Sequence, residues 1–194
     1  IDYVEGDDGD DTLYGGNGND ELFGENGVDT IYGESGNDDL SGGAGDDTIE
    51  GGEGNDNIAG YGGIDTILGG NGNDNIWGDA GGDKLDGGAG DDKIDGGDDG
   101  TADGDTLTGG AGNDLLIDHS PNAIDTLDGG DGSDKIDCLD NQTDHADVVT
   151  GGAGIDEFWM DDIDQLGSDM DVMKEGNAGI PSGLALPNAD KPVA

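Results

Sequence analysis

The sequence predicts an all-β fold, a stacked β-solenoid of about eight 18-residue coils. Three observations predict it: a nine-residue repeat fills residues 6–95 without a break, every copy holds an aspartate and an apolar side chain at fixed positions, and 44 of the 194 residues are glycine. A repeat this short is typical of proteins that stack small units along an axis instead of building a globular core.

The repeat follows the template Gly-x-x-Gly-x-Asp-x-(aliphatic)-x, and its ten uninterrupted copies run from Gly6 to Asp95. Six further copies follow. Those at 96–108 and 138–150 carry four extra residues each, and the copy at 118–128 carries two. The short segment at residues 2–5 fits the last four positions of a preceding copy. We therefore predict one array over residues 1–159, irregular only at the three copies with insertions.

Each copy predicts a short strand followed by a turn. Positions seven to nine read polar, apolar, variable, which suits a three-residue strand whose middle side chain points inward. Positions one to six are rich in Gly, Asn and Asp, which favour turns. Two strands and two turns make one coil, so residues 18 apart stack. The inward apolar residues are Leu13, Leu22, Ile31, Leu40, Ile49, Ile58, Ile67, Ile76, Leu85, Ile94, Leu107, Leu116, Leu127, Ile136, Val149 and Phe158.

Position six is aspartate in all sixteen copies, including those with insertions, because the extra residues precede it. These residues are Asp11, Asp20, Asp29, Asp38, Asp47, Asp56, Asp65, Asp74, Asp83, Asp92, Asp105, Asp114, Asp125, Asp134, Asp147 and Asp156. Stacking at 18-residue intervals places them in two columns, one along each edge of the solenoid.

The charge balance restricts the partners. The chain holds 49 Asp and Glu against 5 Lys and Arg, for a formal net charge of -44. Such a polyanion repels nucleic acid and anionic membranes, and we expect it to stay expanded until cations neutralise it. No apolar run reaches membrane-spanning length, and the single cysteine, Cys138, excludes an intrachain disulfide. No known catalytic motif occurs, so we expect no enzyme activity from this region.

A bound metal ion would neutralise the excess negative charge and supply stability that the small core lacks. One aliphatic side chain per copy contributes about 1.5–3 kcal/mol, less than the backbone entropy lost in ordering nine residues. The turns offer only oxygen donors, the ligands that calcium prefers, whereas His119, His145 and Cys138 form no cluster for zinc. We therefore expect several calcium ions along the two aspartate columns. A merely solvated acidic surface is the alternative, but solvation does not require Asp at every ninth residue.

Position five often offers a second oxygen donor, and we count it among the candidate calcium ligands. The residues are Asp10, Asn19, Asn37, Asp46, Asn55, Asn73, Asp91 and Asn113. Val28, Ile64 and Gly82 break this pattern, so we expect their turns to bind calcium more weakly or through backbone carbonyls.

The pattern resembles the nonapeptide of the RTX (repeats-in-toxin) family, over residues 2 to about 160. The resemblance implies a right-handed parallel β-roll in which each calcium ion lies between two turns on one edge. One turn would give the position-six Asp and even-numbered carbonyls, and its neighbour odd-numbered carbonyls and the position-five side chain. The resemblance also implies a bacterial protein that is exported unfolded through a type I channel and folds outside the cell.

The last residues leave the repeat. Residues 160–175 predict a cap over the open end of the solenoid, and residues 176–194 predict a flexible tail. Two functions remain open: a calcium-folded scaffold, spacer or self-assembling module of a secreted or surface protein, or the non-catalytic C-terminal module of a secreted enzyme or toxin. Self-association or an upstream domain is the partner that each hypothesis implies.

Overall fold

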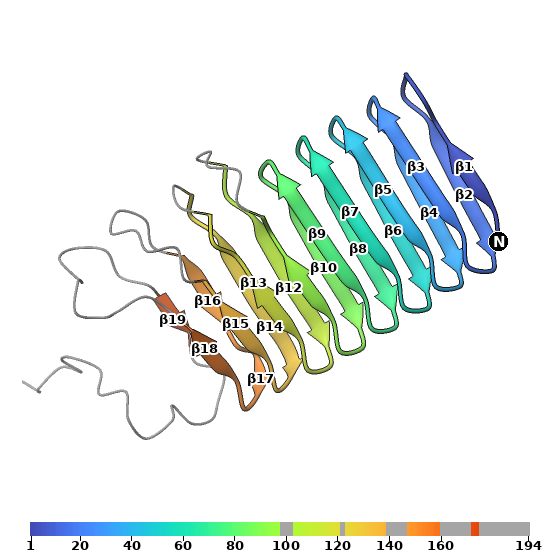
Figure 1. Cartoon of the computed structure of the whole chain (residues 1–194). Helices are drawn as coiled ribbons and strands as arrows, with labels where there is room; N and C mark the ends of the chain where they lie inside the picture. The colour runs from blue at the N-terminus through green and yellow to red at the C-terminus, as the bar shows by residue number, and fades with distance from the viewer. Residues whose placement is uncertain (98–102, 121–122, 139–146, 160–171, 175–194) are drawn as a thin grey trace, which may run out of the picture.

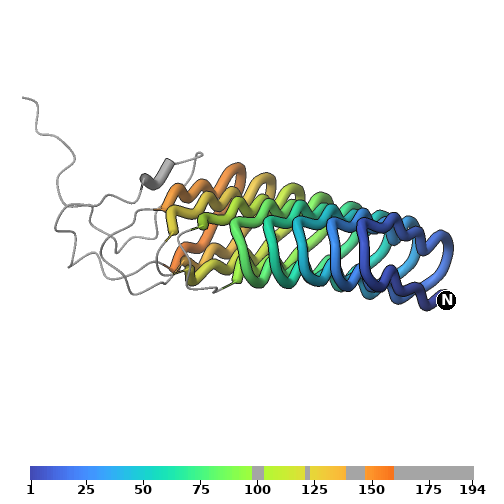
Figure 2. Tube along the Cα trace, turned by 90° about the horizontal axis from the view of Figure 1, so that it is seen from above, coloured from blue at the N-terminus to red at the C-terminus, as the bar shows by residue number. Residues whose placement is uncertain are grey.

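The computed structural model describes residues 1–97, 103–120, 123–138, 147–159 and 172–174. Within these ranges the chain forms strands and turns, and the strands build two parallel sheets that face each other (Figure 1). The chain winds coil after coil along a single axis (Figure 2). No helix in the described ranges is long and apolar enough to cross a membrane.

Strands alternate between the two sheets along the sequence. The nine-stranded sheet holds, in order, β1 (Tyr3–Glu5), β3 (Glu21–Asn26), β5 (Asp39–Ala44), β7 (Asn57–Gly62), β9 (Asn75–Ala80), β11 (Lys93–Asp95), β13 (Leu115–Ile117), β15 (Lys135–Asp137) and β18 (Glu157–Trp159). The ten-stranded sheet holds β2 (Thr12–Asn17), β4 (Thr30–Ser35), β6 (Thr48–Glu53), β8 (Thr66–Asn71), β10 (Lys84–Ala89), β12 (Thr106–Ala111), β14 (Thr126–Gly132), β16 (Val148–Thr150) and β19 (Val172–Lys174), while β17 (Ala153–Gly154) pairs with β14.

The register confirms the predicted solenoid of about eight coils. Leu13 in β2 lies opposite Ile31 in β4, 18 residues later, and the same offset continues up to β10. Where an insertion intervenes, Leu85 still lies opposite Leu107. The extra residues therefore lengthen a connection without shifting the register of the paired strands.

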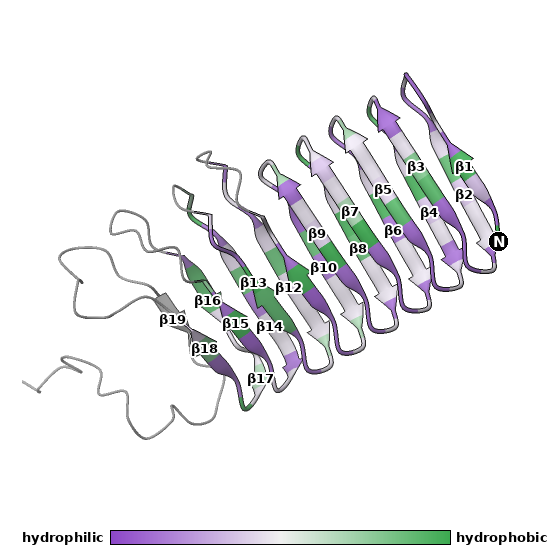
Figure 3. Ribbon diagram, viewed as in Figure 1, coloured by the Kyte–Doolittle hydropathy of each residue, from purple (hydrophilic) through white to green (hydrophobic). Residues whose placement is uncertain are grey.

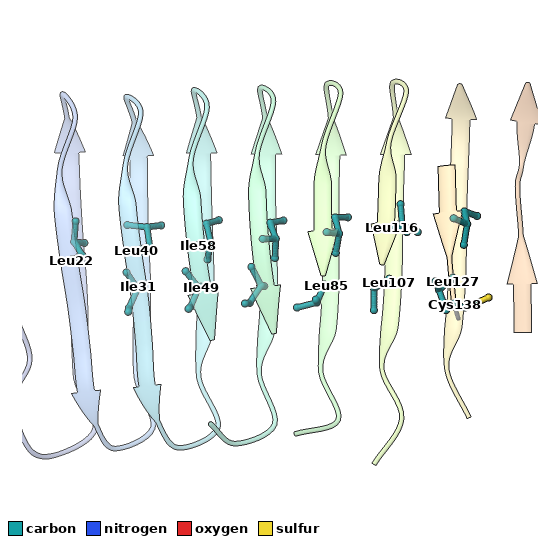
Figure 4. Close-up of a cluster of buried hydrophobic side chains, with 14 of the residues drawn as sticks. Leu22, Ile31, Leu40, Ile49, Ile58, Leu85, Leu107, Leu116, Leu127 and Cys138 are labelled. Atoms are coloured by element: carbon teal, nitrogen blue, oxygen red, sulfur yellow. The ribbon is translucent and has the colours of Figure 1, made fainter. Parts of the chain in front are cut away.

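The core consists of two rows of aliphatic side chains, one from each sheet (Figure 4). The position-eight residues from Leu13 to Val149 are buried, and Phe158 packs against this core while partly exposed. Coloured by hydropathy, the strands show apolar stretches flanked by polar ones (Figure 3). Each coil thus buries only two large side chains, as the repeat predicts.

The predicted three-residue strand is wrong for most of the array. In regular copies the strand has six residues, because it continues through positions one to three of the next copy, as in β2. Position one alternates inward and is buried, as Gly15 shows, and the turn contains only positions four to six. Three-residue strands precede the insertions, at β11, β13 and β15, where the longer turn starts at position one.

The C-terminal predictions fall mostly outside the described residues. Of the predicted cap at 160–175, the structure describes Val172–Lys174, which pairs with β16 as strand β19. The predicted tail at 176–194 lies entirely outside the described residues.

Candidate metal sites at the turns

The turns form two edges, of which one contains all three insertions of the array and the other has turns of constant length. We call the connections from the nine-stranded to the ten-stranded sheet the insertion edge, because the copies at 96–108, 118–128 and 138–150 all connect the sheets there (Figure 1). The return connections form the regular edge. The insertion edge holds Asp11, Asp29, Asp47, Asp65, Asp83, Asp105, Asp125 and Asp147, and the regular edge holds Asp20, Asp38, Asp56, Asp74, Asp92, Asp114, Asp134 and Asp156.

Each position-six aspartate links its coil to the preceding one. The backbone N–H of Asp38 donates to Oδ1 of Asp56 at 2.8 Å, and the N–H of Asp56 donates to Oδ1 of Asp74 at 2.9 Å. The same bond recurs along both edges, from Asp2 to Asp156, at 2.6–3.0 Å. The sequence predicted that these residues form two columns. The structure adds that Oδ1 of each carboxylate from Asp20 to Asp156 accepts a backbone hydrogen bond, and that these bonds form a ladder along each edge.

The second carboxylate oxygen of most of these residues has no such partner. Buried Oδ2 atoms without a hydrogen bond belong to Asp11, Asp20, Asp29, Asp38, Asp47, Asp56, Asp65, Asp74, Asp92, Asp114 and Asp134. A buried anionic oxygen without a partner costs several kilocalories per mole unless a proton or a cation satisfies it. Two columns of such oxygens therefore fit hard dications, which bind carboxylate and carbonyl oxygens.

Backbone carbonyls border the same spaces. A Cβ atom added to Gly33 would lie 2.6 Å from Oδ2 of Asp38 and 2.6 Å from the carbonyl oxygen of Gly51 in the next coil. A Cβ on Gly54 would collide with the carbonyl oxygen of Gly36 in the preceding coil. In the regular copies glycine is thus required at positions one and four, because carbonyl and carboxylate oxygens approach the backbone closely there.

The buried columns hold protons more tightly than exposed carboxylates do. Burial raises the pKa of Asp65 and Asp92 to about 7 and that of Asp56 and Asp114 to about 6, with neighbouring carboxylates adding to the shift. Burial also raises the pKa of Asp47. These shifts measure how unfavourable the ionised columns are without a counter-ion.

The position-five side chains lie in a second, exposed ladder. Oδ1 of Asn37 accepts the backbone N–H of Asn55 at 3.0 Å, and Oδ1 of Asp10 accepts that of Val28 at 3.0 Å. All eight predicted residues accept such a bond from position five of the following coil. This bond gives them a structural role without an ion, and their role as calcium ligands remains a prediction.

Sequence reasoning missed two inward residues at position one. Asp118 and Cys138 replace the glycine that the other fourteen copies hold there, and both are buried, at 2% and 5% exposure. Both stand in copies with insertions. A residue other than glycine at position one is the sequence signal that could have identified both residues.

His119 does not join the carboxylate columns. Its Nε2 lies 3.3 Å from Oδ1 of Asp137, and both side chains are partly exposed. This pair is a local contact on the insertion edge.

Comparison with known proteins identifies the family of the repeat. The model of the RTX calcium-binding nonapeptide repeat, which spans four copies, matches residues 1–31, 32–67, 68–100, 99–118, 122–137 and 143–159. A search of curated proteins found no match to the chain. The family matches cover well over half of the sequence and coincide with the paired coils, and membership implies calcium binding. The chain therefore belongs to the RTX calcium-binding nonapeptide repeat family.

Proposed function

We propose that the chain is a calcium-folded scaffold of a secreted or cell-surface bacterial protein. The observation that carries the proposal is the pair of buried aspartate columns, in which most of the Oδ2 atoms, such as those of Asp38 and Asp56, have no hydrogen-bond partner. With a net charge of -44, the chain repels its own folding until dications occupy the turns. Calcium would then act as a structural part of the roll, and the position-six carboxylates would be its main ligands.

Folding that depends on calcium also suits export. Extracellular oxygen sites commonly bind calcium with dissociation constants of about 0.1–1 mM, far above cytosolic calcium. The chain would therefore remain expanded inside the cell, pass a type I channel unfolded, and fold outside. The folded roll would serve as a rigid spacer between neighbouring modules. Its exposed aromatic rings would supply a contact surface, and the rings of Tyr14 and Tyr32 stack with their centroids 5.1 Å apart.

Circular dichroism during a calcium titration tests the proposal. We expect a cooperative change from coil to β structure as calcium rises, full reversal by chelator, and a much weaker change with magnesium, whose rigid octahedron suits these turns poorly. A chain that is compact and rich in strands after exhaustive chelation at neutral pH would refute the proposal.

A matched pair of single-charge variants sharpens the test. Asp56→Asn removes a buried position-six carboxylate, and Glu50→Gln removes an exposed carboxylate from neighbouring strand β6. We expect Asp56→Asn to raise the calcium concentration at the folding midpoint severalfold and Glu50→Gln to leave it nearly unchanged. Equal shifts would mean that calcium acts only by screening net charge.

A further inference from the structure

Three buried aspartates meet inside the roll at the insertion edge. Asp105, Asp118 and Asp125 each offer a carboxylate oxygen, and these oxygens lie within 4.8 Å of one another. Each residue is only 2% exposed. Asp105 and Asp125 are position-six residues of successive coils, whereas Asp118 stands at position one, outside the repeated ligand set.

Asp118 places a carboxylate where a regular turn has a backbone carbonyl. In the preceding coil of this edge, a Cβ on Gly78 would lie 2.5 Å from Oδ2 of Asp83 and 2.6 Å from the carbonyl oxygen of Gly96. One coil later, a Cβ on Gly96 would lie 2.6 Å from Oδ2 of Asp105 and 2.6 Å from Oδ2 of Asp118. The substitution therefore adds one negative charge to the space between two coils.

The side chain of Asp118 is held in this orientation. Its Oδ1 accepts the backbone N–H of Ser120 at 3.0 Å, and the hydroxyl of Ser120 in turn donates to the carbonyl oxygen of Gly97 at 3.2 Å. Its Oδ2 is buried, is directed into the cluster and has no hydrogen-bond partner. A fixed carboxylate with one unsatisfied buried oxygen is what a cation site requires of a ligand.

Hydrogen bonds to the backbone fix the other two carboxylates. Oδ1 of Asp105 accepts the N–H of Asp83 at 2.7 Å, and Oδ1 of Asp125 accepts the N–H of Asp105 at 2.8 Å. The nearby His119 lies against Asp137 at 3.3 Å. Burial raises the pKa of both Asp105 and Asp118.

We propose that Asp105, Asp118 and Asp125 form a separate site for a hard divalent cation, calcium before others, that differs from the regular turns by its third carboxylate. The three carboxylate oxygens lie within 4.8 Å of one another, a separation that oxygens around a single calcium ion can have, since calcium–oxygen distances are about 2.3–2.6 Å. Three carboxylates around one dication bind it more tightly than two carboxylates and carbonyls do. The site would fasten together the coils that the insertions interrupt.

The proposal rests on the calcium-dependent folding proposed above, and calcium counting separates the two. Equilibrium dialysis of the full chain, followed by metal analysis and calorimetric titration, gives the number of ions per chain and their affinity classes. We compare the wild type with Asp118→Asn, which keeps the size of the side chain, and with Asp118→Gly, which restores the glycine of the repeat. Asp128→Asn removes an exposed charge from the same copy and serves as the matched control.

We expect both Asp118 variants to lose one ion per chain from the tightest class, while Asp128→Asn keeps it. Dichroism at saturating calcium should show the same β structure in all four proteins; if Asp118→Asn fails this check, Asp118→Gly alone decides. Unchanged ion number and affinity in the folded Asp118 variants would overturn the third-carboxylate site and leave the proposed function intact. A wild type that binds no calcium would overturn both.

Discussion

The two edges of the roll differ in how many ladders of hydrogen bonds join their successive coils. On the regular edge the position-six ladder runs beside a second ladder of position-five side chains, which is continuous from Asn19 to Ser133. On the insertion edge the second ladder is reduced to Asp10 and Asp46, because Val28 and Ile64 offer no acceptor. All three insertions lie on the edge where this second ladder is broken.

This difference shows which contacts the stack requires. Asp83 and Asp105 are 22 residues apart, yet the N–H of Asp83 donates to Oδ1 of Asp105 at 2.7 Å, as in a regular turn. The position-six bond thus persists while the rest of the turn changes length. We conclude that position six keeps the register on both edges, whereas the position-five bonds are continuous only along the regular edge.

The largest effect is expected from lowering the pH, which neutralises the aspartate columns on both edges together. The raised pKa values of Asp65 and Asp92, about 7, and of Asp56 and Asp114, about 6, mean that the folded chain holds more protons than the unfolded chain, whose aspartates titrate near 3.8. The free energy of unfolding therefore falls as pH rises from about 4 through 7. In chelator, we expect β structure to increase as pH is lowered from 8 towards 4.

Circular dichroism across this pH range, with light scattering to exclude aggregation near the isoelectric point, measures the effect. With calcium present, protons compete for the same carboxylates, so the calcium midpoint should rise as pH falls. A metal-free chain that loses residual β structure on acidification would contradict the assigned role of the buried columns.

The second prediction compares one position-six residue from each edge. Asp47→Ala removes the acceptor of the Asp29 N–H, and Asp56→Ala removes that of the Asp38 N–H. Each change leaves a buried N–H without its partner, which costs about 1–3 kcal/mol, in addition to removing a proposed calcium ligand. At the Asp56 junction the bond from Asn55 to Asn37 still joins the coils, whereas Val28 supplies no such bond at the Asp47 junction.

We therefore expect Asp47→Ala to destabilise the calcium-loaded roll by about 1 kcal/mol more than Asp56→Ala. Urea unfolding at fixed calcium measures this difference, and hydrogen exchange shows whether the loosening stays near the altered turn. Equal destabilisation would show that the position-five ladder carries no weight.

The third prediction transfers the ladder from one edge to the other. Val28→Asn gives the insertion edge an acceptor facing position five of the next coil, and Asn37→Ala removes one from the regular edge. We expect a gain and a loss, respectively, of about 0.5–1.5 kcal/mol in the free energy of unfolding. If Val28→Asn also reduces the cost of Asp47→Ala in a double-mutant cycle, the ladder explains the difference between the edges.

What the sequence could predict follows from how strictly each position is constrained. Position eight, as in Ile58, and position six, as in Asp56, recur without exception, because one fills the core and the other links the coils. Their spacing was sufficient to predict the solenoid, its columns and its core. The assignment of these carboxylates and of the position-five side chains as calcium ligands remains a prediction.

Strand length was not predictable from propensity alone. Gly15 and Gly16 favour turns locally, yet both belong to strand β2, because pairing with the next coil overrides their preference. Asp118 escaped notice for a related reason: it is one acidic residue among many, and only its inward position at an enlarged turn gives it meaning.

The smallest expected effect concerns backbone strain, which also differs between the edges. Non-glycine residues with positive φ stand at position two in Asp7, Glu25, Tyr61 and Asp79, which lead into the insertion edge, and in Glu34, which leads into the regular edge. Tyr61 has a φ of 74° and an exposed side chain, so it gains little burial in return for this strain.

Tyr61→Gly should therefore raise the free energy of unfolding by about 0.5–1 kcal/mol, since the relief of left-handed strain exceeds the added flexibility of glycine. The control Ala59→Gly, in the same strand but without a positive φ, should lower it by about 0.5–1 kcal/mol. Urea unfolding at saturating calcium measures both. If Tyr61→Gly raises the free energy of unfolding while Ala59→Gly lowers it, the backbone at position two of the insertion edge is strained in the native chain. If both variants lower it, the ring of Tyr61 has a packing role.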